Sequence, residues 1–190
     1  MEQTCTLRIK NMVCPRCIAA VRQCLSGLGI APLSVELGEA TVSAPLDDTL
    51  RQHVAEKLAA LGFKLLDDPR AKLVEQIKNA IVQLVHYREE PLTVNLSQYL
   101  SDHLHRDYSQ LSKLFSETTG TTIEKYFIAQ KIERAKELLV YGELTLAEIA
   151  DRLGYSSAAY LSTQFKQVTG LTPSYFKQLK ENRRRPLDEI

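Results

Sequence analysis

A short residue pattern occurs twice in this chain, and the two copies lie 50 residues apart. The first copy is Leu111, Ser112, Phe115, Thr119, Gly120 and Thr122, and the second is Leu161, Ser162, Phe165, Thr169, Gly170 and Thr172. A repeat at a fixed period indicates that one supersecondary unit occurs more than once. The apolar spacing is helical, and each glycine suits the end of a helix. The repeat therefore predicts two similar helical units.

Each copy follows a short segment that can begin a helix. Asn95 with Gln98, and Thr145 with Glu148, have the spacing of a capping box. Each unit is therefore expected to be helix, tight turn, helix, and in such units the second helix lies in the major groove of DNA. A long helix expected at about 123–141 separates the units. It can hold the two second helices roughly one DNA turn apart, about 34 Å, so that one chain reads two successive grooves.

The second unit reads LAEIADRLGYSSAAYLSTQFKQVTGLTPSYFK. With this sequence, residues 92–180 resemble the DNA-binding domain of the AraC/XylS family of bacterial transcription regulators. The resemblance implies that the partner is double-stranded promoter DNA and that the first recognition helix lies at about 107–118. It also implies the following DNA-facing residues: Tyr108, Ser109, Ser112 and Lys113 in the first unit, and Ala158, Ala159, Tyr160, Thr163 and Lys166 in the second.

Two positions depart from the pattern of that family. Thr163 stands where the family often has an arginine, and the neighbouring alanines can contact only thymine methyl groups. Base readout by the second unit is therefore expected to be weak, with DNA shape supplying part of the specificity. In the first unit, His105 replaces the usual turn glycine, and the turn is one residue shorter.

The first 66 residues show the alternation of apolar and polar residues that is typical of strands. Strands are expected at 4–10, 33–37, 40–44 and 63–66, and helices at 15–28 and about 48–61. This order is the split βαβ arrangement, in which two helices pack on one face of an antiparallel sheet. The predicted fold class is therefore α+β. A βαββαβ ferredoxin-like domain at 1–68 precedes a linker helix at 69–90 and an all-α domain with two helix-turn-helix units at 91–190.

All four cysteines lie near the N-terminus, at positions 5, 14, 17 and 24. Cys14 is expected to end a loop and Cys17 to lie in the first turn of a helix, where the helix N-terminus and Arg16 favour thiolates. Two close thiolates suit a soft ion of low coordination number, such as Cu(I). Zn(II) is the second choice because a structural zinc site needs four ligands, which two molecules together would supply. Cys5 and Cys24 are expected in the core.

The loop Asn11-Met12-Val13-Cys14-Pro15-Arg16-Cys17 and the later Leu61-Gly62-Phe63, within the βαββαβ order, carry a second resemblance. They are similar to the heavy-metal-associated domain of copper chaperones and metal-pumping ATPases. This resemblance implies that Cys14 and Cys17 are metal ligands, that Met12 anchors the loop, and that Phe63 packs near the metal. The usual Gly-Met-Thr-Cys of that family is Asn-Met-Val-Cys here.

Three hypotheses for the N-terminal domain remain open. In the first, it senses a soft metal and alters DNA binding through the linker helix. In the second, it is a metal-free module for homodimerisation or for docking a protein partner. In the third, the Cys-x-x-Cys is a redox-active dithiol, although the thioredoxin-like context of such motifs is not evident. Because no nucleophile motif, phosphate loop or carboxylate pair stands out, we expect that the protein is not an enzyme.

The net charge of +1 does not by itself indicate nucleic-acid binding, but basic residues gather near the C-terminus. Residues 166–185 hold one acidic residue, Glu181, and these basic ones: Lys166, Lys177, Lys180, Arg183, Arg184 and Arg185. Such a patch favours contact with phosphates. No run of about 18 apolar residues and no apolar leader is evident, so we expect a cytoplasmic protein without membrane contact.

Overall fold

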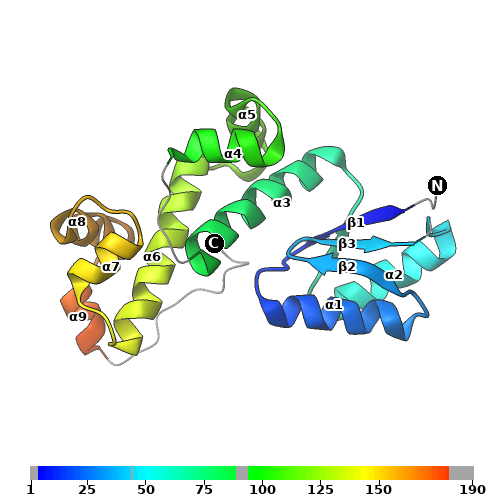
Figure 1. Ribbon diagram of the computed structural model, residues 1–190, viewed down its shortest axis with the longest axis horizontal. Coiled ribbons are helices and arrows are strands. Elements are labelled where there is room, and N and C mark those ends of the chain that lie inside the picture. Colours follow the sequence, from blue (N-terminus) through cyan, green and yellow to red (C-terminus); the bar gives the residue numbers. More distant parts are fainter. Residues whose placement is uncertain (1–3, 44, 89–93, 180–190) are drawn as a thin grey trace. The chain divides into compact units, whose positions relative to one another are not determined.

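The computed structural model describes residues 4–43, 45–88 and 94–179 (Figure 1). The chain divides into two compact units, Met1–Asn79 and Ala80–Ile190. The boundary between them lies within α3 (Pro69–Val82), inside the segment 69–90 that the sequence assigns to a linker helix. None of the helices in the described ranges is long and apolar enough to cross a membrane.

The N-terminal unit contains a four-stranded antiparallel sheet and two helices in the predicted order. The elements are β1 (Cys5–Lys10), α1 (Pro15–Gly27), β2 (Pro32–Glu36), β3 (Glu39–Val42), α2 (Asp48–Ala60) and β4 (Lys64–Leu66). The strand order in the sheet is β2-β3-β1-β4, so β1 is central. Figure 1 shows α1 and α2 on the same side of this sheet. The loop that carries Cys14 leaves the end of the central strand and leads directly into α1.

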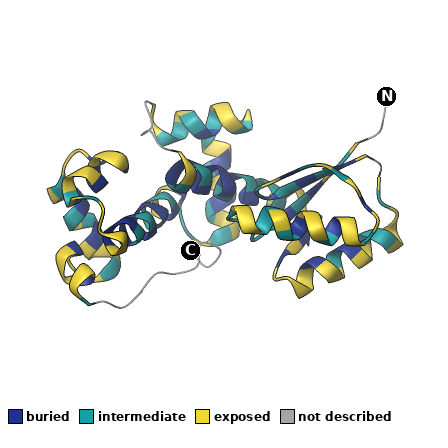
Figure 2. Ribbon diagram, turned by 60° about the horizontal axis from the view of Figure 1, so that its bottom comes forward, coloured by how far each residue is buried: buried dark blue, intermediate teal, exposed yellow. Residues whose placement is uncertain are grey.

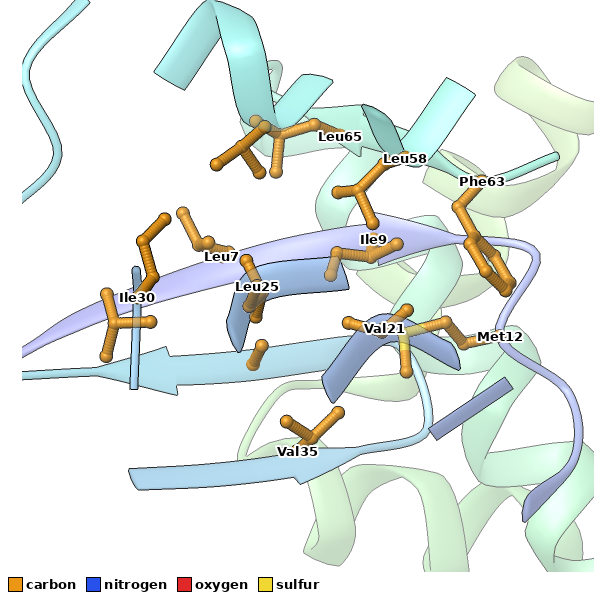
Figure 3. Close-up of a cluster of buried hydrophobic side chains, with 13 residues drawn as sticks. Leu7, Ile9, Met12, Val21, Leu25, Ile30, Val35, Leu58, Phe63 and Leu65 are labelled. Atoms are coloured by element: carbon orange, nitrogen blue, oxygen red, sulfur yellow. The ribbon is translucent and has the colours of Figure 1, made fainter. Parts of the chain in front are cut away.

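The core of this unit lies between the sheet and the two helices (Figure 3). Leu7 and Ile9 of β1 are fully buried, whereas Arg8 between them pairs with Glu39. The helices cover this face with Val21 and Leu25 of α1 and Val54 and Leu58 of α2. Each such side chain contributes roughly 1.5–3 kcal/mol on burial. Leu61 is 52% exposed because it lies past the last turn, at the C-cap of α2.

The part of α3 that belongs to the N-terminal unit, up to Asn79, contacts the rest of that unit at two places. Gly38, in the hairpin between β2 and β3, has φ +82°, and a Cβ added there would lie 1.7 Å from Nδ2 of Asn79. The hairpin therefore needs glycine both for its backbone conformation and for this close approach. In the loop after β1, the Asn11 backbone N–H donates to Oε1 of Glu75, at 3.2 Å. Thus α3 is joined to the same loop that leads to Cys14.

The C-terminal unit is helical throughout its described residues. After α3 come the π-helical turn η1 (Gln83–Tyr87), α4 (Leu96–Leu104), α5 (Tyr108–Thr119), α6 (Ile123–Tyr141), α7 (Leu146–Arg152), α8 (Ala158–Thr169) and α9 (Pro173–Gln178). The helix α6 contacts η1, α5, α7, α8 and α9. In Figure 1, the α4–α5 pair lies near the start of α6 and the α7–α8 pair beside its later part. The long helix expected at about 123–141 therefore supports both helix pairs, α4–α5 and α7–α8.

Buried residues run along most of α6 (Figure 2), and several of them are polar. Gln130 is fully buried: its Oε1 accepts a hydrogen bond from Nε2 of His86 at 2.9 Å, and its Nε2 donates to the Tyr126 hydroxyl at 3.0 Å. Lys136 and Glu133 form a buried ion pair at 2.6 Å. Because helices cover α6 on several sides, its polar positions are enclosed together with its apolar stripe.

Candidate functional site

The two copies of the repeat have the same local structure. The Thr119 hydroxyl donates to the Phe115 carbonyl at 2.8 Å, and the Thr169 hydroxyl donates to the Phe165 carbonyl at 2.7 Å. The glycine that follows each threonine, Gly120 or Gly170, has φ close to +75°. Each threonine thus ties down the last turn of its helix, and the glycine ends it. The sequence repeat therefore corresponds to a structural repeat.

The repeat extends further than the sequence analysis recognised. The Phe115 ring lies 5.7 Å from the ring of Tyr126 in α6, and the Phe165 ring lies 5.6 Å from that of Phe176 in α9. Tyr126 and Phe176 are both buried, and they are separated by the same 50 positions as the rest of the repeat. The signal that could have revealed them is an aromatic residue at the same offset in both copies.

The helix starts and turns of the two units agree with the predictions in different degrees. Thr145 and Glu148 form a complete capping box at the start of α7. At the start of α4, Asn95 accepts from the Gln98 backbone at 2.8 Å, but the Gln98 side chain donates to Asp102 instead of reaching back. His105 has φ +52° and so takes the left-handed conformation that Gly154 has in the second turn, with φ +65°.

Each recognition helix buries one face and exposes the other. Leu111 and Phe115 of α5, like Leu161 and Phe165 of α8, are fully buried. The predicted DNA-facing residues that are exposed are Ser109 and Lys113 on α5 and Ala159, Tyr160, Thr163 and Lys166 on α8. Val168, near the end of α8, is 41% exposed, so the buried core contacts of α8 end at Phe165.

Three of the predicted DNA-facing residues, Tyr108, Ser112 and Ala158, are half-buried. The Tyr108 hydroxyl donates to Glu124 of α6, and burial, together with this bond, raises the pKa of Tyr108. Ala158 packs against the core cluster of the second unit. The Thr163 hydroxyl, although exposed, donates to the Ala159 carbonyl at 3.0 Å. Of the basic patch near the C-terminus, Lys166 and Lys177 are described, and residues 180–185 lie outside the described residues.

The second candidate site is the pair of thiols at the start of α1. Cys14 is the N-cap residue and Pro15 the first residue of the helix, as expected, and the Cys14 and Cys17 sulfur atoms lie 3.2 Å apart. The loop before them is fixed by Asn11, which has φ +73° and donates through Nδ2 to the Gly62 carbonyl at 3.0 Å. Met12 beneath the loop is fully buried, and Phe63 is 8% exposed.

The electrostatics of the thiol pair differ from the expectation for Cys17. Burial, followed by the hydrogen bond with Cys14, raises the pKa of the Cys17 thiol, so burial outweighs the helix N-terminus at this position. No third histidine, cysteine, aspartate or glutamate completes a ligand cluster among the residues whose placement is described. Cys5 and Cys24 are partly buried against the core, and burial also raises the pKa of Cys24.

Paired helix-turn-helix units on one supporting helix define a DNA-binding module. Residues 100–178 match the family model described as "Helix-turn-helix domain". The C-terminal domain of AraT, a response regulator from Geobacillus stearothermophilus, is similar in structure, with a TM-score of 0.51 at 25% identity over 60% of this chain and 91% of that chain. The C-terminal unit therefore has the fold of a helix-turn-helix DNA-binding domain.

Curated proteins that this chain resembles are named as regulators. The chain is 27% identical to the HTH-type transcriptional regulator AlkR of Acinetobacter baylyi over 69% of this chain and 40% of that protein. It is 31% identical to the xylose operon regulatory protein of Escherichia coli K12 over 53% of this chain and 26% of that protein. The chain thus matches well under half of the length of these relatives.

Proposed function

We propose that the protein regulates transcription by placing α5 and α8 in two successive major grooves of promoter DNA, and that its N-terminal unit makes this binding depend on a soft metal ion. The observation that carries the first part is the repeated structure: two recognition helices with the same buried face and the same exposed face, on one support. At about 1.5 Å per residue, the 19 residues of α6 span about 28 Å, close to one DNA turn of about 34 Å.

The exposed side chains suggest a division of roles on the DNA. Lys113 and Lys166 suit phosphate contacts, which position the protein on the duplex. Tyr160 can hydrogen-bond to base edges, and the Ala159 methyl group suits a thymine methyl. The Ser109 hydroxyl donates to Asp107, and its oxygen can still accept a hydrogen bond from a base. Tyr108, Ser112, Ala158 and Thr163 complete the proposed face, with smaller contributions because their groups are half-buried or already hydrogen-bonded.

Salt-dependent binding tests this interface. An operator is first selected from random duplexes with the full chain, and its affinity is then measured by fluorescence anisotropy at several salt concentrations. Lys113→Ala and Lys166→Ala are each expected to weaken binding to all duplexes and to reduce the slope of log K against log salt by about one. Lys57→Ala, on exposed α2, is the matched control. Unchanged slopes for both variants would remove α5 and α8 from the interface.

The metal part of the proposal is supported by the thiol pair and its surroundings. Two sulfur atoms 3.2 Å apart, with no third ligand in the described residues, fit a two-coordinate soft ion such as Cu(I), and do not fit a four-ligand zinc site within one chain. The loop is anchored by buried Met12 and linked to α3 through Asn11 and Glu75. A bound ion supplies charge and fixes the loop, and this contact offers a route to the linker helix.

Metal and DNA are tested together in a second experiment. The full chain is titrated with Cu(I) against a chromogenic chelator, and operator affinity is measured with and without the ion. Cys14→Ser combined with Cys17→Ser is expected to abolish binding of Cu(I) and its effect on DNA affinity, while Cys24→Ser leaves both unchanged. If the operator affinity of the wild-type chain is the same with and without Cu(I), the sensing role is refuted and the DNA-binding role is not.

A metal-free docking module is the second candidate for the N-terminal unit, and one observation favours it. A shallow apolar groove of about 440 Å³ runs between the outer faces of α1 and α2, and it includes Cys24, Leu28 and the exposed Leu61. If the double cysteine variant regulates a promoter as the wild type does, this groove becomes the better explanation. A redox dithiol is less well supported because the thioredoxin-like context of such motifs is not evident.

A further inference from the structure

A cavity of about 200 Å³ lies inside the C-terminal unit, between η1, α6 and the end of α7. Its apolar wall includes Leu84 and Val85 of η1, Phe127 of α6 and Leu153 of α7. Its polar wall is basic, with Arg88, Lys131, Arg134 and Arg152, and none of the described residues that line it is acidic. The DNA-binding role described above makes no use of this partly open pocket.

Lys131 is the distinctive residue of the cavity. It is only 8% exposed, and its ammonium lies 3.8 Å from the centre of the Tyr155 ring and 5.3 Å from that of Phe127. Among the described residues, no carboxylate pairs with it, whereas neighbouring Arg134 pairs with Glu137 at 2.5 Å. Burial without a counter-charge lowers the pKa of Lys131 to about 8.

The two rings offset only part of the cost of burying this cation. An aromatic face attracts an ammonium group, but it has no lone pair to accept a conventional hydrogen bond. Because a lysine ammonium has three N–H donors, the two rings do not replace the hydrogen bonds that water provides. Buried charges in proteins are normally paired with an opposite charge. A cavity that holds an unpaired cation against an apolar wall therefore has the features of a binding site for an anion with an apolar body.

We propose that this cavity binds a small organic carboxylate, with the carboxylate at Lys131 and the apolar body against Leu84, Val85 and Phe127. The cavity has the volume of roughly six or seven liquid water molecules, at about 30 Å³ each, which limits the ligand to a single ring or a short chain. Part of its wall is the π-helical turn η1, and π-helical turns occur frequently at functional sites.

The position of Tyr155 connects this site with the second recognition helix. The Tyr155 hydroxyl donates to Oε1 of Gln164 in α8 at 2.5 Å, and its ring lies 5.8 Å from the ring of Tyr160. An anion that draws Lys131 away from the Tyr155 ring acts on the residue that holds α8. A change in operator affinity on ligand binding is therefore expected, and this one consequence rests on the proposed DNA contacts of α8.

Calorimetric titration of the full chain without DNA tests the binding site directly. Benzoate is compared with benzamide, which has the same ring and nearly the same shape but no charge, and hexanoate tests a flexible chain of similar size. Benzoate is expected to saturate one site at least tenfold more tightly than benzamide. Inorganic phosphate, which lacks an apolar body, is expected to bind more weakly than benzoate. Equal affinity for benzoate and benzamide, or no saturation by benzoate and hexanoate, would overturn the proposal.

A matched pair of variants on α6 assigns the binding to Lys131. Lys131→Met removes the cation and keeps a long side chain, and is expected to lower benzoate affinity at least tenfold. Lys125→Met, on the exposed start of the same helix, is expected to bind benzoate as the wild type does. Unchanged affinity in folded Lys131→Met would refute the assignment. If Lys131→Met does not fold, the comparison of benzoate with benzamide on the wild-type chain still tests the binding site. Because that titration contains no DNA, its outcome does not depend on whether the proposed DNA binding is correct.

Discussion

His105 and Asn11 are the residues other than glycine that have positive φ in the described part of the chain, at +52° and +73°. A side chain in the left-handed region costs roughly 1–2 kcal/mol. Both positions belong to the candidate sites: His105 ends α4 within the first helix-turn-helix unit, and Asn11 begins the turn that leads to Cys14 and Cys17. The sequence identified the first of these correctly, because His105 stands at the position of a turn glycine.

Replacing His105 with glycine is expected to stabilise the protein. Glycine adopts positive φ without strain, but it also has more freedom in the unfolded chain, so the net gain is at most about 1 kcal/mol. His105→Ala keeps a Cβ, hence the strain, and is expected to give no gain. Urea denaturation of both variants measures the difference, and equal free energies of unfolding for the glycine and alanine variants would contradict the strain argument.

Thr119 and Thr169 are expected to contribute equally to stability, since each hydroxyl makes the same set of bonds. Besides the phenylalanine carbonyl, the Thr169 hydroxyl bonds to the Leu171 carbonyl and accepts from the Leu171 backbone, both at 3.1 Å. Replacing either threonine with valine is expected to lower the free energy of unfolding by about 1–2 kcal/mol. Thr121→Val is the control, with an expected change within about 0.5 kcal/mol. If the loss of free energy of unfolding differs widely between the Thr119 and Thr169 variants, the two copies of the repeat are not energetically equivalent.

At the scale of helices and strands, the sequence predicted most elements because their apolar periodicity is clear, and it failed where burial does not follow periodicity. Ile128 of α6 packs against the core while remaining half-buried, whereas the polar Gln130 and Glu133 of the same helix are buried. A helix surrounded by other helices encloses residues on several faces, and the sequence pattern does not say which helices surround it. For the same reason, the cavity at Lys131 left no signal in the sequence.

The contact between α3 and the thiol loop gives a prediction with a definite sign. Burial raises the pKa of Glu75, although the Asn11 backbone N–H and the charges of Lys78 and Lys10 oppose the shift. The charged form of Glu75 is therefore disfavoured in the folded state. The contribution of Glu75 to the free energy of unfolding falls as the pH rises through its ordinary pKa toward the raised one.

Glu75→Gln keeps an oxygen acceptor for Asn11 but does not ionise. Below about pH 4, the variant and the wild type are expected to have similar free energies of unfolding. As the pH rises toward neutrality, the variant is expected to become more stable than the wild type. Thermal denaturation from pH 3.5 to 7.5 measures this difference. A gap between the two proteins that stays constant over that range would mean that Glu75 does not ionise at a cost in the folded state.

At the scale of the C-terminal unit, α6 sets the distance between α5 and α8, the two proposed recognition helices, because it contacts both and is buried along most of its length. A rigid support of about 28 Å cannot lengthen to follow its target.

An operator with 5 base pairs inserted between its two half-contacts is therefore expected to lose affinity at least 100-fold, because the second groove turns to the opposite side of the duplex. An insertion of 10 base pairs restores the side but adds about 34 Å, and is expected to be as harmful. Anisotropy measurements at fixed salt compare the three duplexes. Two molecules that each read one half-contact through a flexible connection would tolerate the 10-base-pair insertion, so recovered affinity there would show that the two contacts come from different chains.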